Sequence, residues 1–207
     1  MKNKKIIVAS GNKDKIQEIK YVLKGLQFDI VSKDDMGLDN IEVIEDKETL
    51  AENAIKKAVE ISKHVDGIVI ADDTGLFVDA LDGRPGVYSA RYAGENVTYK
   101  DNNDKLLKEL KDISLDKRKA AFKTVIAIVF EDKSVKTVEG QCEGYIGFQP
   151  KGSQGFGYDP LFIVEGYEKT FAELGEDIKN RVSHRARALN ALKEELQRMI
   201  KGEDTSI

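Results

Sequence analysis

The segment GIVIADD, residues 67–73, is a short apolar run that stops at two adjacent acids. A run of this length is too short for a helix, so it predicts a strand that ends at Asp72 and Asp73. The segment before it, residues 48–65, is predicted to be a helix, because its apolar residues recur at helical spacing. These residues are Ala51, Ala54, Ala58, Ile61 and Val65.

The same alternation extends toward the start of the chain. Residues 5–9 form another short apolar run, bounded by Ser-Gly-Asn, and residues 28–31 form a third. Between them, apolar residues mark one face of a helix, namely Ile16, Ile19, Val22, Leu23 and Leu26. Strands that alternate with helices imply a sheet with helices packed on its faces.

The second half of the chain is richer in predicted β-structure and in glycine. We expect glycine-rich loops over 79–94 and 151–160, a helix over 101–110, a hairpin of 120–131 and 134–146, a strand over 161–164 and a final helix over about 183–200. The predicted class is α/β, with an elongated mixed sheet, flanking helices and two lobes around a central cleft. We expect residues 1–207 to form a single domain, with a frayed tail from about residue 202.

Composition narrows the class of protein and its surroundings. With 41% hydrophobic residues the chain can bury a full core, and its net charge of −4 argues against general binding of nucleic acid. No apolar run approaches the length of a membrane span or of a signal peptide. Cys142 is the only cysteine, which excludes a disulfide framework and a thiolate metal cage. We therefore expect a cytoplasmic protein without a membrane or nucleic-acid partner.

The segment SGNKDK, Ser10–Lys15, lies between the first predicted strand and the first helix. The start of a helix exposes backbone N–H groups, which suit a phosphate. Gly11 lets the backbone approach closely, Asn12 can cap the helix or donate, and Lys15 supplies a cation. A plain capped helix start is an equal alternative.

Carboxylates form a second group of candidate residues. Glu45 precedes the helix over 48–65, and Asp72 and Asp73 follow the strand after it. Two such carboxylates can hold Mg²⁺ while phosphate oxygens complete its octahedron, and one can accept a proton from water. The alternative is that Asp73 merely opens a turn, because Asp-Thr-Gly is favourable turn chemistry.

The segment GFGYDP, residues 155–160, places an aromatic ring between glycines. Phe156 can project from a tight loop and stack on a flat base, while Asp159 is held extended before a proline. Phe156 and Tyr158 can equally belong to the core, which is the commoner fate of an isolated aromatic pair.

The segment RVSHRARAL, residues 181–189, places His184 and Arg185 at the start of the final helix, just after Ser183, a good N-cap residue. Lys179 lies a few residues upstream. A rigid cluster of donors suits an electron-rich anionic ligand, although an ordinary basic first turn explains it equally well. Together the candidate residues indicate a nucleoside triphosphate as the ligand. They supply cations for the phosphates, acids for Mg²⁺, and an aromatic platform with donors for a base.

Five blocks of the chain, in order, resemble the inosine triphosphate pyrophosphatase family. They are SGNKDK (10–15), EDKETLAENAIKKA (45–58), ADDTGLFVDALDGRPGVYSARYAG (71–94), GFGYDP (155–160) and KNRVSHRARAL (179–189). Members of this family hydrolyse the non-standard purine nucleoside triphosphates ITP, dITP and XTP to the monophosphate and pyrophosphate. They form homodimers with an elongated two-lobed α/β fold.

The resemblance also implies roles for individual residues. The triphosphate would be bound by Ser10, Gly11, Asn12, Lys13, Asp14 and Lys15. Mg²⁺ would be held by Glu45 and Asp73, and Asp73 would also be the catalytic proton acceptor for water. The other substrate contacts would be Thr74, Phe156, Gly157, Tyr158, Asp159, Lys179, His184 and Arg185. Lys57 matches a lysine that is common in the family.

A preference for these bases has a physical interpretation. Hypoxanthine and xanthine carry a keto oxygen at C6, where adenine carries an amino group. Donors such as His184 and Arg185 can hydrogen-bond to the keto oxygen but leave the amino group without an acceptor. The chain departs from the family at Gln154, where a glycine is expected. If this position needs a positive φ, the side chain strains the loop.

Three rival interpretations remain. One is a septum-associated type of nucleotide pyrophosphatase with a similar fold and pyrimidine or modified substrates, which the SHR and FGYD blocks argue against. The second is a nucleotide sensor without catalysis, which the presence of Lys15, Glu45 and Asp73 disfavours. The third is a nucleic-acid-binding module, which conflicts with the acidic charge balance.

Overall fold

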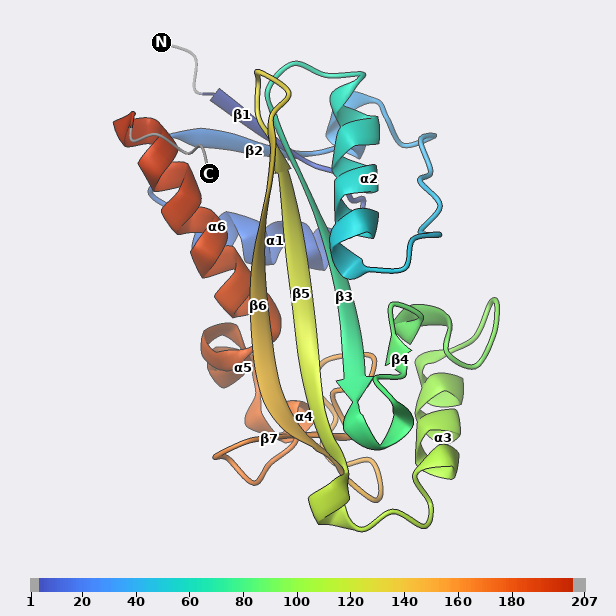
Figure 1. The fold of residues 1–207 in the computed structure, drawn as a ribbon. Helices are drawn as coiled ribbons and strands as arrows, with labels where there is room; N and C mark the ends of the chain where they lie inside the picture. The colour runs from blue at the N-terminus through green and yellow to red at the C-terminus, as the bar shows by residue number, and fades with distance from the viewer. Residues whose placement is uncertain (1–3, 203–207) are drawn as a thin grey trace. The chain divides into compact units, whose positions relative to one another are not determined.

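The computed structural model describes residues 4–202, and of Asp14 only the backbone is described. Strands and helices alternate through the first half, as the sequence predicts (Figure 1). These elements are β1 (Lys4–Val8), α1 (Lys13–Val22), β2 (Phe28–Ser32), α2 (Leu50–Ser62) and β3 (Ile68–Val78). The predicted frayed tail falls, from residue 203 onward, outside the described residues.

The second half contains the predicted hairpin and several short elements. The elements are β4 (Pro85–Gly86), α3 (Tyr99–Glu109), β5 (Lys119–Val129), β6 (Val135–Ile146), β7 (Phe162–Val164), α4 (Phe171–Leu174), α5 (Glu176–Val182) and α6 (His184–Lys201). The sheet has the order β2-β1-β3-β5-β6-β7, with β4 paired to β3. Strand β1 pairs in parallel with β2 and β3, whereas β3–β4 and β6–β7 are antiparallel, so the predicted mixed sheet is confirmed.

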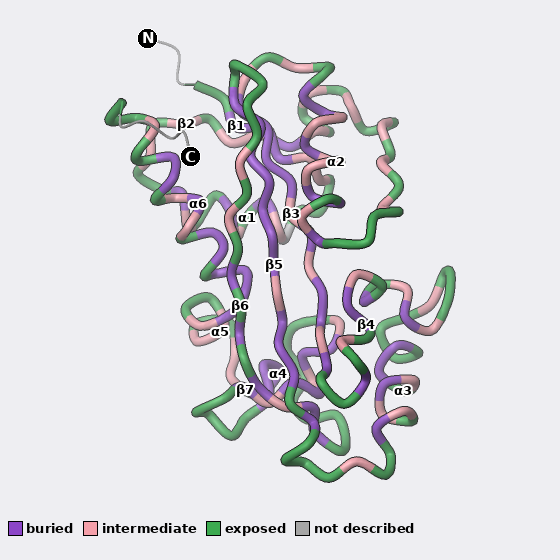
Figure 2. The backbone as a smooth tube through the Cα atoms, in the orientation of Figure 1, coloured by how far each residue is buried: buried purple, intermediate pink, exposed green. Residues whose placement is uncertain are grey.

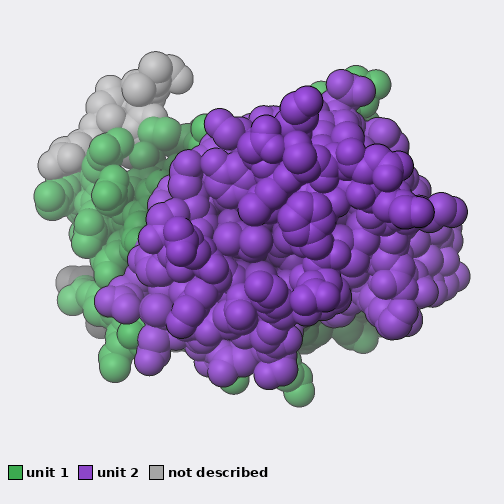
Figure 3. Space-filling model, turned by 90° about the horizontal axis from the view of Figure 1, so that it is seen from below, with its two compact units in different colours: residues 1–73, 125–139, 188–207 green, residues 74–124, 140–187 purple. Residues whose placement is uncertain are grey.

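The chain divides into two compact units, which Figure 3 shows in two colours. The first contains residues 1–73, 125–139 and 188–207, and the second contains residues 74–124 and 140–187. Strands β3, β5 and β6 and helix α6 each contribute residues to both. Each unit has its own hydrophobic core, and the central cleft expected from the sequence stays a prediction.

The core of the first unit has two layers, because successive side chains of a strand point to opposite faces of a sheet. Ile68 and Ile70 of β3 pack in one cluster with apolar residues of α1 and α6. Val69 and Ala71 pack in the other cluster with Ala54, Ala58 and Ile61 of α2. Most of β3 is purple in Figure 2, because most of its residues are buried. Different helices therefore pack against the two faces of β3.

The third strand does not end at Asp72 and Asp73, and this prediction is wrong. Strand β3 continues through both acids to Val78, so neither Asp73 nor Thr74 opens a turn. The polar residues keep the alternation of the strand, since Asp73 is buried while Asp72 is partly exposed. The two acids therefore project from opposite faces of one strand.

The second unit has an aromatic core. The ring centroids of Phe122 and Phe162 lie 4.8 Å apart, and those of Phe162 and Phe171 lie 5.3 Å apart. Close packing extends to the backbone, because a Cβ added at Gly144 of β6 would lie 2.2 Å from the carbonyl oxygen of Ile163 in β7. The pairing of β6 with β7 therefore requires glycine at position 144.

We expect Gly144→Ala to lower the free energy of unfolding by about 1–3 kcal/mol, because the added methyl group forces the two strands apart. Urea unfolding followed by circular dichroism measures this change. Glu139→Ala, at an exposed position of the same strand, is the control and should change stability by no more than about 0.5 kcal/mol. Equal stability of the two variants would contradict the steric argument.

Candidate active site

The start of α1 is held by its own side chains. The hydroxyl of Ser10 accepts a hydrogen bond from the Asn12 N–H at 3.1 Å, and Asn12 Oδ1 accepts one from the Lys15 N–H at 3.1 Å. A Cβ at Gly11 would lie 2.4 Å from Oδ2 of Asp34, so a larger residue here would require the exposed carboxylate of Asp34 to shift. The capped helix start is confirmed, and the role of Ser10–Lys15 in binding phosphate stays a prediction.

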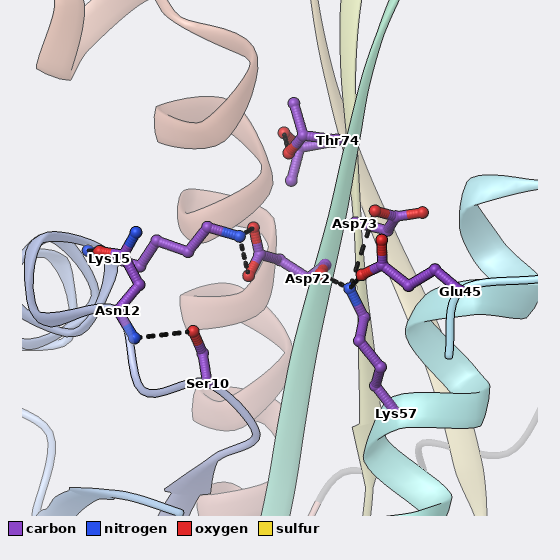
Figure 4. Close-up of polar contacts among 9 residues, drawn as sticks. Ser10, Asn12, Lys15, Glu45, Lys57, Asp72, Asp73 and Thr74 are labelled. Carbon is purple, nitrogen blue, oxygen red and sulfur yellow. Dashed lines mark hydrogen bonds and ion pairs between the residues drawn. The ribbon is translucent and has the colours of Figure 1, made fainter. Parts of the chain in front are cut away.

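The side chain of Lys15 reaches back to β3. Its Nζ lies 3.1 and 2.9 Å from the two carboxylate oxygens of Asp72 (Figure 4). Asp72 projects from the face of β3 whose apolar residues pack with α1. Lys15 thereby neutralises one of the two adjacent acids.

The other acid belongs to a separate cluster on the α2 side. Lys57 of α2 donates to the carboxylate of Glu45 in a short hydrogen bond and to the carbonyl oxygen of Asp72 at 2.6 Å. Its Nζ lies 3.7 Å from Oδ1 of Asp73. Figure 4 shows Glu45, Lys57 and Asp73 pointing toward one another. One ammonium group therefore joins two carboxylates that are 28 positions apart in the chain.

The charge of Lys57 is secured by these neighbours. Burial by itself lowers the pKa of the ammonium group, but the carboxylates of Asp73, Glu45 and Asp72 outweigh it, so that the pKa of Lys57 is raised above its ordinary value. The lysine is consequently cationic throughout the neutral pH range.

The acids of this site fit a divalent cation only in part. No group of three or more His, Cys, Asp or Glu side chains within the described residues could hold a metal ion by itself. Glu45 and Asp73 do converge on one cation, whereas Asp72 is held on the opposite face of β3. Mg²⁺ commonly takes one or two carboxylates and completes its shell with water and substrate phosphates, so the pair fits Mg²⁺ bound together with a phosphate.

The remaining predicted residues lie in the second unit. Thr74 follows Asp73 directly, and its hydroxyl shares a 2.8 Å hydrogen bond with the hydroxyl of the buried Thr124 in β5. The sequence analysis did not single out Thr124. A threonine that directly precedes an apolar run, residues 125–129, is the one signal that could have drawn attention to it.

The glycine-rich loop is built around Asp159, which is only 3% exposed. Oδ2 of Asp159 accepts hydrogen bonds from the Phe156 N–H at 2.9 Å and from the ammonium group of Lys179. A Cβ at Gly155, where φ is +77°, would lie 2.1 Å from the same oxygen. Glycine is therefore essential at position 155. Asp159 shapes the loop by binding two of its neighbours.

Gln154 does not strain this loop. Outside glycine, the positive φ angles of the described residues lie at Asp82, Asn96, Lys133 and Glu168. The position of Gln154 thus imposes no left-handed backbone, and the departure from the family pattern carries no conformational cost.

The two aromatic residues of the loop have different environments. Phe156 is 43% exposed, whereas Tyr158 is buried in the core, with its hydroxyl donating to the carbonyl oxygen of Ser89 at 2.8 Å. Lys179 Nζ lies 4.8 Å from the centroid of the Phe156 ring. An exposed ring beside a cation agrees with a stacking platform, and Tyr158 supports the loop from beneath it.

The start of α6 combines a cap with two basic residues. The hydroxyl of Ser183 accepts from the Ala186 N–H at 3.1 Å, which confirms the predicted N-cap. His184 is buried and stacks on Phe122, with 4.6 Å between ring centroids and 19° between ring planes. The guanidinium of Arg185 lies 5.8 Å from the centroid of the Phe156 ring. Arg185 and Lys179 therefore both reach the exposed aromatic ring.

The structure thus arranges the predicted residues in two groups. In the first unit it brings Glu45 and Asp73 together around Lys57 and pairs Lys15 with Asp72. In the second unit it gathers Phe156, Asp159, Lys179, His184 and Arg185 around one loop and one helix start. Lys13 is exposed at the start of α1, and the side chain of Asp14 lies outside the described part of the chain.

Comparison with known proteins identifies the family. The Ham1 family model matches residues 6–195. A dITP/XTP pyrophosphatase of Thermoanaerobacter pseudethanolicus is 53% identical over 189 residues, which is 91% of this chain and 94% of the relative. The chain therefore belongs to the Ham1 family, and the predicted resemblance is confirmed.

Solved structures agree with this assignment. The Staphylococcus aureus Ham1 protein is 38% identical, with a TM-score of 0.86 over 97% of this chain and 100% of that chain. A nucleoside-triphosphatase/dITP/XTP pyrophosphatase from Mycobacterium abscessus is 42% identical, with a TM-score of 0.77 over 91% of this chain and 97% of that chain. The α/β fold with a mixed sheet and flanking helices is thus shared within the family.

The different burial of Phe156 and Tyr158 predicts different effects on stability. Tyr158→Ala should lower the free energy of unfolding by about 3–5 kcal/mol, because it empties part of an aromatic core. Phe156→Ala should cost only about 1–2 kcal/mol, because the ring is partly exposed. Chemical unfolding of both variants tests this, and an equal loss would place both rings in the core.

Proposed function

We propose that this protein is a nucleotide pyrophosphatase that hydrolyses ITP, dITP and XTP to the nucleoside monophosphate and pyrophosphate. Its action would remove non-standard purines from the nucleotide pool and keep them out of DNA and RNA. The convergence of Glu45 and Asp73 on one cation carries the proposal, because that pair has the ligands a metal–triphosphate complex needs. Relatives of the same family that carry the name dITP/XTP pyrophosphatase support it.

The proposed chemistry is direct attack of water on the α-phosphorus, with pyrophosphate as the leaving group. Glu45 and Asp73 would hold Mg²⁺, which supplies charge neutralisation on the phosphates. Asp73 would also accept the proton of the attacking water. Ser10 to Lys15 would bind the triphosphate at the start of α1, and Lys15 and Lys179 would neutralise charge that develops on oxygen.

The second group of residues would recognise the base. Phe156 offers an exposed ring for stacking, and Arg185 and His184 lie at the start of α6 beside that loop. Donors at this place would hydrogen-bond to the 6-keto oxygen of hypoxanthine or xanthine, and would leave the amino group of adenine without an acceptor. Thr74, Gly157, Tyr158 and Asp159 complete the proposed substrate contacts, with Tyr158 acting from the core.

The setting of the enzyme is also part of the proposal. No helix in the described part of the chain is long and apolar enough to cross a membrane. The resemblance to its family supports a homodimer in the cytoplasm that depends on Mg²⁺. Cys142 gives no support to thiol chemistry, because burial raises the pKa of its thiol to about 11.

A panel of nucleotides tests the proposed reaction. With Mg²⁺ present, we expect kcat/KM for ITP and XTP to exceed the values for ATP and GTP by a factor on the order of a hundred or more, because a buried mismatch at C6 or C2 leaves polar groups unpaired. The products are separated as pyrophosphate and orthophosphate. Orthophosphate as the first product, or equal rates on ATP, would contradict the assignment.

Replacement of the proposed proton acceptor tests the mechanism. Asp73→Asn should lower kcat at least about a hundredfold, because the amide can neither accept the proton nor ligate the metal well. Its circular dichroism spectrum should match that of the wild type. Asp72→Asn is the matched control on the opposite face of β3 and should retain much more activity. Full activity of Asp73→Asn would refute its role.

A further inference from the structure

Lys57 occupies the position between the two proposed metal ligands. Its ammonium group touches the carboxylate of Glu45, lies 3.7 Å from Oδ1 of Asp73 and donates to the carbonyl oxygen of Asp72 at 2.6 Å. These are the oxygen types that a hard divalent cation prefers. An ammonium group and a metal ion therefore compete for the same two carboxylates.

The chain segments that carry the two carboxylates are held without the ammonium group. Glu45 is held through its neighbours, because Lys56 donates to the carbonyl oxygen of Ile44 at 2.9 Å and to the carboxylate of Asp46 at 2.7 Å. Asn53 Oδ1 accepts from the Lys47 N–H at 3.0 Å. Hydrogen bonds to helix α2 thus hold the segment on both sides of Glu45.

Asp73 is fixed independently, because it lies within β3 and is only 8% exposed. The strand fixes the backbone from which its carboxylate projects. A shift of the flexible lysine side chain would therefore leave the backbone of both Glu45 and Asp73 in place.

Local charge decides what can displace the lysine. Lys15 and Lys57 face the carboxylates of Glu45, Asp72 and Asp73, so this group carries one net negative charge. A free divalent cation would have to bind while Lys57 stays charged nearby, which weakens its binding. A triphosphate brings anionic oxygens that give the displaced ammonium group a new partner.

We propose that Lys57 is a stand-in cation, which neutralises the Glu45–Asp73 pair in the nucleotide-free protein and delays metal binding until the triphosphate arrives. The divalent cation then enters together with the nucleotide and not ahead of it. This inference rests on the proposed function, because it assumes that Glu45 and Asp73 are the metal ligands.

Binding of Mn²⁺ to the nucleotide-free protein tests the inference, with free Mn²⁺ measured by electron paramagnetic resonance at pH 7.5. We expect Lys57→Met to bind Mn²⁺ at least about tenfold more tightly than the wild type, because a competing unit charge is removed. Lys57→Arg keeps the charge and should bind as weakly as the wild type. Equal or weaker binding by Lys57→Met would overturn the proposal.

Lys63→Met is the matched control. It removes the same charge from the end of the same helix, but Lys63 is exposed and contacts Glu60 and not the carboxylate pair. Its affinity for Mn²⁺ should stay within about twofold of the wild type. If both variants tighten equally, the effect is one of long-range charge and the proposal fails.

A second variant and a separate activity measurement complete the experiment. If Lys57→Met does not fold, Lys57→Gln replaces it, since its amide is a polar donor without a charge, and the same gain is expected. Release of pyrophosphate from ITP by the wild type is measured separately. If the wild type cleaves ITP but Lys57→Met and Lys57→Gln bind Mn²⁺ no more tightly than the wild type, this inference alone is refuted. If the wild type releases no pyrophosphate from ITP, the proposed function is refuted.

Discussion

The proposed catalytic group of this protein depends on one requirement: the negative charge of buried carboxylates must be neutralised by a nearby cation. Asp73 is almost fully buried, and the half-buried Glu45 lies beside the same ammonium group. Without Lys57, two negative charges would face each other at a partly desolvated place, which is costly. The contact of α2 with β3 is therefore electrostatic as well as apolar, since Ala54 and Ala58 pack next to the lysine along the same helix.

The period of the strand separates the roles of two neighbouring acids. Asp72 and Asp73 differ by one position and so point to opposite faces of β3. Each meets a lysine from a different helix, Lys15 of α1 and Lys57 of α2. Two adjacent acids that look equivalent in the sequence thus have different partners, and only Asp73 converges with Glu45.

Much of this arrangement could be predicted from the sequence, and the failures have physical causes. The α2 helix followed from apolar spacing, because it buries a regular stripe, and the β5–β6 hairpin followed from two β-rich segments joined by Asp132 and Lys133. The end of β3 was predicted wrongly, since two acids look like the end of an apolar run when they in fact continue its alternation. Spacing also could not show which lysine meets which carboxylate, because such contacts join distant segments.

The glycine-rich loop also shows what the sequence could not decide. Its sequence left Phe156 and Tyr158 open between an exposed stacking position and the core. The structure exposes Phe156 and buries Tyr158. The strain expected at Gln154 is absent, because the positive φ angles fall on the neighbouring glycines at 152, 155 and 157. The residue at position 154 is therefore free to vary without a conformational cost.

A double-mutant cycle between Lys57→Met and Glu45→Gln measures the central interaction most directly, with the free energy of unfolding as the observable. The account predicts a coupling free energy of about 1–3 kcal/mol between the two positions, because each side chain neutralises the other in a partly desolvated place. Additive effects of the two substitutions, with a coupling near zero, would show that the lysine does not hold the carboxylate pair together.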